Sequence, residues 1–468
     1  MRLGILPVIR PTFDVAAATD VIDRARTVLR RQGHELIGPS TPAVGDDEVG
    51  RAADRLLDHD DLDALVVLQG TFTTSIGATT AARSGRPIVL WSFPEPEPDG
   101  TRRLRLNSLC GATLASYTLH RLGADVRWVH AHPDDPGTRE RLGGALDTPV
   151  DRADPVRPPH PTSTAAARDA ARSTAERLRG LHIGRLGHAP AGFEPCDYDD
   201  DQVERRIGVV IDQQPLDTLF AAADATTVPV VVRTRESATV GDVGLEQLEP
   251  HGVEQSVRLL SGMRELVDRH HWAAVTTRCW PECMSEYGGA VCWPSAVMAD
   301  AGIPAGCEAD VLGTITNLAL QQLAERPPFL ADLVAVDIGA DTGTLWHCGV
   351  AAASLARPDA PVQLADHPNR RVPMVHDFGL APGPITVARL TRRPSGDMAL
   401  VIGAGEVLDA DAALQGTSAV VRFDHPAVEV LDRVLGDGLD HHLSMAYGDL
   451  RPELEALAGE WGIGVIDL

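Results

Sequence analysis

Two acids, Glu308 and Asp310, directly follow the short apolar run Ile303–Cys307. We expect that run to be a buried strand, which places both carboxylates at the carboxyl edge of a sheet, where open α/β sheets bind ligands. Acids in the first turn of a helix are also favoured by the helix dipole alone. The pair therefore indicates a site only if further ligating side chains converge on it.

Further acids and an imidazole follow within 40 residues. Asp332 ends the segment Phe329-Leu330-Ala331-Asp332, and Asp337 and Asp341 come soon after. Any of these three acids could instead belong to a turn, where aspartate is common. His347 stands in an apolar strand-like stretch, where a histidine is either a hydrogen-bonded core residue or a ligand.

The last candidates are the adjacent histidines His441 and His442. Neighbouring side chains of a strand point to opposite faces, so we expect only one of the two to face a given site. Carboxylates and imidazole together form a donor set that suits Mn²⁺. Arg10, just after the first strand, could bind a ligand hydroxyl or an anionic group, or could be an ordinary surface arginine.

The 42 basic residues are all arginine, because the chain contains no lysine. Schiff-base chemistry, the phosphate-binding lysine of P-loops and the ATP lysine of protein kinases are therefore excluded. Cys279 and Cys283 lack the second ligand pair of a zinc site, and Gly403-Ala404-Gly405 lacks the rest of a dinucleotide fingerprint. Chemistry must rest on carboxylates, histidines, cysteines, hydroxyls, arginines or a metal.

The formal net charge of −24 disfavours nucleic acid and anionic membrane surfaces as partners. No apolar run is long enough to cross a bilayer, and the N-terminus does not read as a signal peptide. The seven cysteines are scattered through the chain and do not form a disulfide framework. These features predict a cytoplasmic protein.

The pattern of apolar runs predicts three domains. In residues 1–150, strand-like Leu3–Leu6, Ala64–Leu68, Pro87–Trp91 and Val126–Val129 alternate with helical stretches, which is typical of a doubly wound parallel sheet. The proline-rich segment 151–164 reads as a linker. A second α/β domain over 165–344 carries Glu308 and Asp332, with strands predicted at His182–Leu186, Gly208–Ile211, Pro229–Val232 and Trp272–Thr276. Residues 345–468 are strand-rich, which favours an antiparallel sheet or barrel.

These motifs resemble, in order, those of the fucose/arabinose isomerase superfamily. In the C-terminal half the likeness lies in Cys279-Trp280-Pro281-Glu282, Gly302–Asp310, Phe329–Asp332, Trp346–Gly349 and His441–Asp449. In the N-terminal half it lies in Leu68–Phe72, Val89–Trp91, Pro94–Pro96, Asn107–Gly111, and Gly187 with Gly192-Phe193. The likeness spans nearly the whole chain.

The resemblance implies two Rossmann-like domains, a C-terminal β-barrel domain and a homo-oligomer, a trimer or hexamer, with an active site possibly shared between subunits. It implies Mn²⁺ held by Glu308, Asp332 and His442, with Asp337 or Asp341 and His441 as the alternatives. Glu308 and Asp332 are then also the catalytic groups, and Arg10, Trp280 and His347 are expected to contact the substrate.

The expected reaction is the interconversion of an aldose and a ketose through a metal-stabilised cis-enediol. The substrate would be a fucose- or arabinose-like sugar or another hexose, including a sulfonated one such as sulfoquinovose. The alternatives are a metal-dependent sugar aldolase or epimerase, and a sugar-binding sensor without catalysis.

Overall fold

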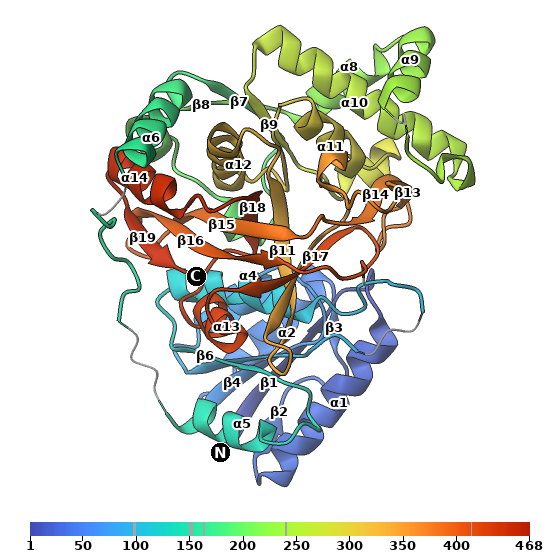
Figure 1. Ribbon diagram of the computed structural model, residues 1–468. Coiled ribbons are helices and arrows are strands. Elements are labelled where there is room, and N and C mark those ends of the chain that lie inside the picture. Colours follow the sequence, from blue (N-terminus) through green and yellow to red (C-terminus); the bar gives the residue numbers. More distant parts are fainter. Residues whose placement is uncertain (97–99, 149–152, 162–163, 239–240, 413) are drawn as a thin grey trace.

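The computed structural model describes residues 1–468 except 97–99, 149–152, 162–163, 239–240 and 413 (Figure 1). It contains two parallel sheets covered by helices and, after them, a large mainly antiparallel sheet. This architecture confirms the predicted fold class. Within the described residues, no helix combines the length and apolar character needed to cross a membrane.

The first sheet has the strand order β2-β1-β4-β5-β6, with β3 pairing to β1. β1, β4 and β5 are buried almost throughout, as expected for parallel strands covered on both faces. The order reverses between β1 and β4, which makes their carboxyl ends a ligand-binding position. The strands are β1 (Arg2–Ile9), β2 (Glu35–Ile37), β3 (Ala43–Val44), β4 (Ala64–Gln69), β5 (Ile88–Ser92) and β6 (Val126–His130).

The helices of this unit begin and end at ordinary signals. The side chain of Asp14 accepts a hydrogen bond from the backbone N–H of Ala17 at the start of α1, and α1 ends with two arginines that suit the helix dipole. α4 is buried on every side from Ser108 to Leu119, because it lies between the first sheet and the barrel (Figure 1). The helices are α1 (Val15–Arg31), α2 (Asp46–Leu57), α3 (Ile76–Ala82), α4 (Ser108–Arg121) and α5 (Thr138–Asp147).

The second sheet has the order β10-β9-β7-β8, again parallel. Its strands are β7 (His182–Leu186), β8 (Val210–Gln214), β9 (Ala274–Thr277) and β10 (Ala305–Cys307). The accompanying helices are α6 (Ala165–Leu178), α7 (Asp200–Arg206), α8 (Leu216–Asp224), α9 (Val228–Ala238), α10 (Pro250–His270), α11 (Cys292–Asp300) and α12 (Val311–Ala324).

One predicted strand of this region is wrong. The apolar run Pro229–Val232 lies in helix α9, which packs on α10 away from the second sheet (Figure 1). Val231 is buried there, whereas Val228 is 64% exposed. The β-branched run favoured a strand locally, but the available packing partner was a helix.

The third sheet contains a closed barrel of six antiparallel strands, in the order β17-β12-β11-β18-β15-β16 and back to β17. The barrel strands are β11 (Phe329–Asp337), β12 (Thr342–His347), β15 (Gly383–Arg392), β16 (Met398–Val407), β17 (Thr417–Phe423) and β18 (His442–Tyr447). β13 (Gln363–Asp366), β14 (Pro373–Gly379) and β19 (Gly464–Asp467) extend this sheet, and α13 (Ala427–Gly436) and α14 (Arg451–Trp461) cover it.

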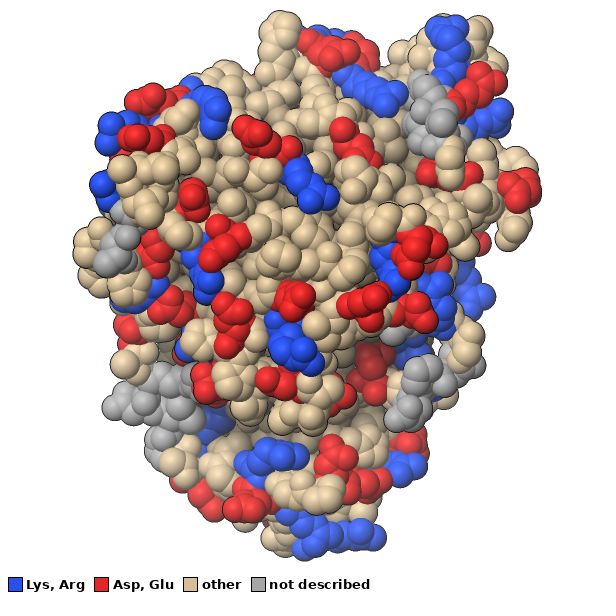
Figure 2. Space-filling view, in the orientation of Figure 1, with Lys and Arg blue, Asp and Glu red and all other residues tan. Residues whose placement is uncertain are grey.

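The third sheet begins with β11, so Asp332 is a barrel residue and connects the second α/β unit to the barrel. The linker predicted over 151–164 includes 151–152 and 162–163, which lie outside the described residues. Its described part is held against the barrel side, because Arg157 pairs with Val465 of β19 and forms ion pairs with Glu455 and Asp467. On the face shown in Figure 2, acidic and basic side chains are interspersed.

Candidate active site

One cavity lies where the three sheets meet. The first sheet supplies residues that follow β1 and β4, the second supplies residues that follow β9 and β10, and the barrel supplies β11, β12 and the start of β18. All six side chains predicted for the site line this cavity: Arg10, Trp280, Glu308, Asp332, His347 and His442.

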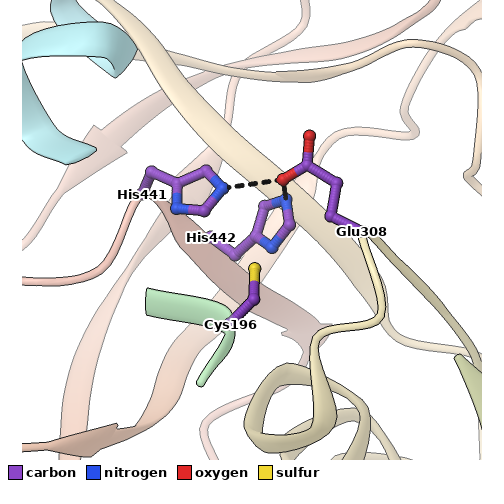
Figure 3. A group of neighbouring side chains, drawn as sticks. All are labelled: Cys196, Glu308, His441 and His442. Carbon is purple, nitrogen blue, oxygen red and sulfur yellow. Dashed lines mark hydrogen bonds and ion pairs between the residues drawn. The ribbon is translucent and has the colours of Figure 1, made fainter. Parts of the chain in front are cut away.

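Glu308 is placed by the turn between β10 and α12. Its backbone has a φ of +57°, in the left-handed region that non-glycine residues seldom adopt. Its Oε1 accepts a hydrogen bond from the indole N–H of Trp280 at 3.0 Å. Its Oε2 lies 3.1 Å from His441 Nε2 and 3.6 Å from His442 Nε2 (Figure 3). This backbone conformation therefore directs the carboxylate of Glu308 toward the two histidines.

Asp332 is placed by strand register. It stands on β11 directly beside His442 of β18 on one side and Trp346 of β12 on the other. Its Oδ1 lies 3.9 Å from His442 Nε2. That oxygen is buried and has no hydrogen-bond partner among the described residues. Buried polar atoms are normally satisfied, so the orphaned oxygen indicates that a ligand belongs there.

The His442 ring is oriented by Asp310, whose Oδ2 lies 2.9 Å from His442 Nδ1. With Nδ1 bound in this way, Nε2 points to Glu308 and Asp332. Asp310 also forms an ion pair with Arg389, which is fully buried and binds Asp440 at 2.8 Å as well. Metal-binding histidines commonly donate their other ring N–H to a carboxylate, which fixes the orientation of the ring.

The expectation that only one of the two histidines faces the site is wrong. Both His441 and His442 line the cavity, with ring centroids 4.0 Å apart. β18 begins at His442, so His441 still belongs to the preceding turn and the alternation of a strand does not apply to it. His441 therefore reaches the same Glu308 oxygen as its neighbour.

The pKa values of the clustered residues shift in different directions. Burial alone would raise the pKa of Glu308, but the hydrogen bond from His441 and the charges of both histidines outweigh it and lower that pKa. Burial raises the pKa of Asp332, against the pull of the histidines. Burial would lower the pKa of His441, but the hydrogen bond and charge of Glu308 raise it.

The donor set fits a hard divalent metal ion. Glu308 and Asp332 offer carboxylate oxygens, His442 offers Nε2, and Asp332 Oδ1 has no other partner among the described residues. Cys196, in the short helix Glu194–Cys196, lies within 4.8 Å of Glu308, His441 and His442 as well (Figure 3). Burial and the charges of Asp310 and Glu308 raise the pKa of its thiol.

Of the remaining predicted residues, His347 lines the cavity, whereas Asp337 and Asp341 lie outside it. His347 ends β12 inside the cavity, with Nδ1 3.1 Å from Cys348 Sγ and a buried Nε2 that has no hydrogen-bond partner among the described residues. Asp337, at the far end of β11, and Asp341 are exposed; they cap the backbone N–H groups of Ala340 and Ala427. Neither of these two alternatives lines the cavity.

Next to the ring of Trp280, the cavity is lined by two arginines, here called the guanidinium pair: Arg10 and Arg370. Both guanidinium carbons lie over the ring of Trp280, at 4.6 Å for Arg10 and 5.0 Å for Arg370. Arg10 also lies over Phe72, and it is only 9% exposed. Burial and the charge of Arg370 lower the pKa of Arg10 to about 10. Neither forms an ion pair with a carboxylate of the described chain.

Sequence reasoning missed two residues, Arg370 and Arg389, and did not predict the contact between Asp310 and His442. Arg370 stands in the loop between β13 and β14, in a segment without any motif. Asp310 was placed with Glu308 at the edge of a sheet, with a helix-start acid as the alternative; it does cap α12, but it also orients His442. Arg389 sits in a barrel strand, and an arginine in an otherwise apolar strand was the one available signal of a buried charge network.

All seven cysteines are free thiols. Cys279 Sγ lies 3.2 Å from Cys307 Sγ. Cys292, Cys348 and His367 form a second buried group whose ligand atoms lie within 4.8 Å of one another.

The comparisons with known proteins bear on the whole chain. Residues 4–146 match the profile described as fucose/sulfoquinovose isomerase, N-terminal domain. A sulfoquinovose isomerase of Clostridium sp. (strain MSTE9) is 30% identical over 98% of this chain and 97% of its own length. Those of Alkalicoccus urumqiensis and Priestia aryabhattai are each 26% identical, over 99% and 96% of this chain and 98% and 95% of their own lengths.

A polyketide synthase ketoreductase found among solved structures is too dissimilar to bear on the fold, with 14% identity and a TM-score of 0.22 over 65% of this chain and 77% of its own.

Proposed function

The chain belongs to the fucose/sulfoquinovose isomerase family, which confirms the resemblance seen in its motifs, and we propose that it converts the aldose sulfoquinovose into the corresponding ketose. Sulfoquinovose isomerase is the name of each of the three relatives, which align with this chain from end to end. The reaction moves one hydrogen between C2 and C1 of the open-chain sugar and changes the oxidation level of both carbons in opposite directions.

The observation that carries this proposal is the convergence of Glu308, Asp332 and His442 from three separate strands or turns on one buried cavity. An isomerase of this kind needs a base above one face of the sugar and stabilisation of the enediolate oxygens. A sugar-binding sensor has no need for such a set of groups.

Glu308, Asp332 and His442 would hold the metal, and Mn²⁺ suits their oxygen and imidazole donors. When bound, such an ion supplies Lewis-acid stabilisation of negative charge on the sugar oxygens O1 and O2. The chain's own groups do the rest. Asp310 holds the His442 ring in place, and Trp280 holds the Oε1 of Glu308.

Carboxylates beside the reacting carbons transfer the proton. We assign proton removal at C2 and its return at C1 to Glu308 and Asp332, whose carboxylates lie 3.6 and 3.9 Å from His442 Nε2. His347, with its unpartnered Nε2 in the cavity, is positioned to bind a sugar hydroxyl. The apolar walls formed by Phe72 and Trp346 limit the access of water to the enediol.

A panel of aldoses tests the proposal. The purified protein is incubated with Mn²⁺ and sulfoquinovose, or with fucose, arabinose or glucose, and the products are identified by NMR. We expect ketose from sulfoquinovose, loss of turnover after dialysis against EDTA, and its recovery with Mn²⁺ rather than Ca²⁺. Cleavage fragments would indicate an aldolase, a second aldose an epimerase, and binding without any product a sensor; each of these results would overturn the proposal.

A further inference from the structure

We propose that the guanidinium pair, Arg10 and Arg370, binds the anionic group of the substrate and selects a sulfonated sugar over a neutral one. This inference rests on the proposed function and adds to it the residues that recognise the sulfonate. It begins from the fact that two like charges share one largely enclosed site.

The charges of the two cations act on each other, and the charges of Asp46 and Glu308 offset them only from beyond ion-pair distance. Both lie over the same indole ring, and the charge of each arginine has no carboxylate of the described chain within ion-pair distance. The fully buried Arg389, by contrast, forms ion pairs with Asp310 and Asp440. A buried charge without a partner is costly, and two adjacent like charges are more so. Such an arrangement is retained where a ligand brings the missing negative charge.

The pair is held rigidly, as a binding site requires. Arg10 directly follows β1, and its backbone N–H donates to Thr71 Oγ1 at 2.7 Å, which joins it to the loop after β4. Arg370 is held by a tight turn in which the N–H groups of Asn369 and Arg370 donate to His367 Nδ1 at 3.2 and 3.3 Å. Arg103 in turn donates to the side chain of Asn369 at 3.1 Å. The backbone at both arginines is therefore held in place, and the ring of Trp280 supports both guanidinium groups.

Trp280 joins this end of the cavity to the reacting end. Its N–H donates to Glu308, while its ring contacts both guanidinium groups. A ligand that spans the cavity therefore meets carboxylates and imidazoles at one end and two cations at the other. A hexose with its carbonyl at C1 and a sulfonate at C6 has the matching polarity. A sulfonate is fully ionised at neutral pH and offers three acceptor oxygens, which suit the planar donor fork of arginine.

The test is a binding experiment in a background without turnover. Glu308→Gln is combined with Arg10→Met or Arg370→Met, which remove the charge and keep the apolar stem. Matched controls are Arg370→Lys and Arg371→Met; Arg371 is the exposed neighbour in the same turn. Calorimetry compares sulfoquinovose with quinovose, the same sugar without the sulfonate.

We expect each methionine variant to weaken binding of sulfoquinovose about 10- to 100-fold, the usual effect of losing a hydrogen bond to a charged group. Quinovose binding should not change, Arg370→Lys should lie in between, and Arg371→Met should match the parent. The melting temperature of the sugar-free protein should stay the same or rise in both methionine variants, because an unpaired buried charge has been removed.

Equal affinity for sulfoquinovose with and without the guanidinium pair would overturn the proposal, as would an equal loss for both sugars or a lower melting temperature that accounts for the loss. The proposed function is judged separately, by ketose formation in the wild-type protein. If an Arg10→Met, Arg370→Met double variant converts sulfoquinovose with an unchanged KM, the guanidinium pair does not bind the sulfonate, and the proposed isomerase activity still stands. If the methionine variants bind sulfoquinovose more weakly but the wild-type protein forms no ketose, the proposed isomerase activity is wrong and the role of the guanidinium pair in binding still stands.

Discussion

The two ends of the cavity are built on opposite electrostatic principles. At the reacting end, almost every charge faces a partner: Glu308 faces His441 and His442, and Asp310 faces His442 and Arg389. At the other end, Arg10 and Arg370 both contact the ring of Trp280, and neither forms an ion pair with a carboxylate of the described chain. A site that is internally neutralised can work on its own groups or on a bound metal. A site with surplus charge is complete only with its ligand.

The largest effect should follow from changes at the reacting end. Glu308→Gln or Asp332→Asn should each lower kcat by about 100-fold or more, the magnitude usual for general acid–base groups. Asp337→Asn is the matched control, because Asp337 lies on the same strand but is exposed and outside the cavity. Steady-state rates on sulfoquinovose measure both. If the Asp337→Asn protein is inactive and the Asp332→Asn protein is active, the catalytic aspartate is Asp337 and the assignment of Asp332 is wrong.

A smaller effect should come from the group behind the histidine. Asp310→Asn leaves His442 in place but removes the anion that orients its ring, so Mn²⁺ affinity should fall about 10- to 100-fold. Mn²⁺ titration followed by electron paramagnetic resonance measures this affinity. Asp440→Asn is the control, because Asp440 shares Arg389 with Asp310 but does not contact His442. Equal affinities in the two variants would mean that Asp310 acts only through Arg389.

A free anion should compete at the guanidinium end alone. Sodium sulfate should raise the KM for sulfoquinovose a few-fold and leave kcat unchanged, because its oxygens can occupy the same donors. Sodium chloride at equal ionic strength separates this effect from general screening. A fall in kcat at saturating sugar would show that sulfate reaches the reacting end instead.

The smallest effect extends the comparison to a histidine outside the cavity. His130 is buried against Ser92 without an anion, and burial together with the charge of Arg141 lowers its pKa to about 4, whereas Glu308 raises that of His441. The unfolded chain takes up this proton near pH 6.5 and the folded chain only near pH 4, so His130 lowers stability as the pH falls between those values.

The expected loss is about 1 kcal/mol between pH 6.5 and 5.5, from the linkage of one proton. Denaturant unfolding of His130→Gln and wild-type protein over this range measures the difference. The variant should show a shallower decline. Parallel curves for the two proteins would mean that His130 titrates alike in the folded and unfolded chains.

The sequence predicted what depends on local pattern. Buried runs such as Ala64–Leu68 alternate with helical stretches, and these elements formed where expected. Glu308 could be found because it follows a buried strand, whereas Asp332 and His442 were singled out by the resemblance of their motifs to the isomerase superfamily. Pro229–Val232 failed because its packing partner was a helix, and Arg370 left no signal because a loop arginine is usually solvated. Which charges lack a partner is a property of the folded chain, so the guanidinium pair emerged only from the structure.

The central claim is that carboxylates of this cavity carry a proton between C2 and C1 of sulfoquinovose. The direct test is to run the reaction with Mn²⁺ in D₂O and to examine the ketose by NMR. A carboxylic acid near solvent exchanges its proton before returning it, so we predict solvent deuterium at C1 of the ketose. Ketose formed without deuterium at C1 would contradict the proton-transfer roles of Glu308 and Asp332.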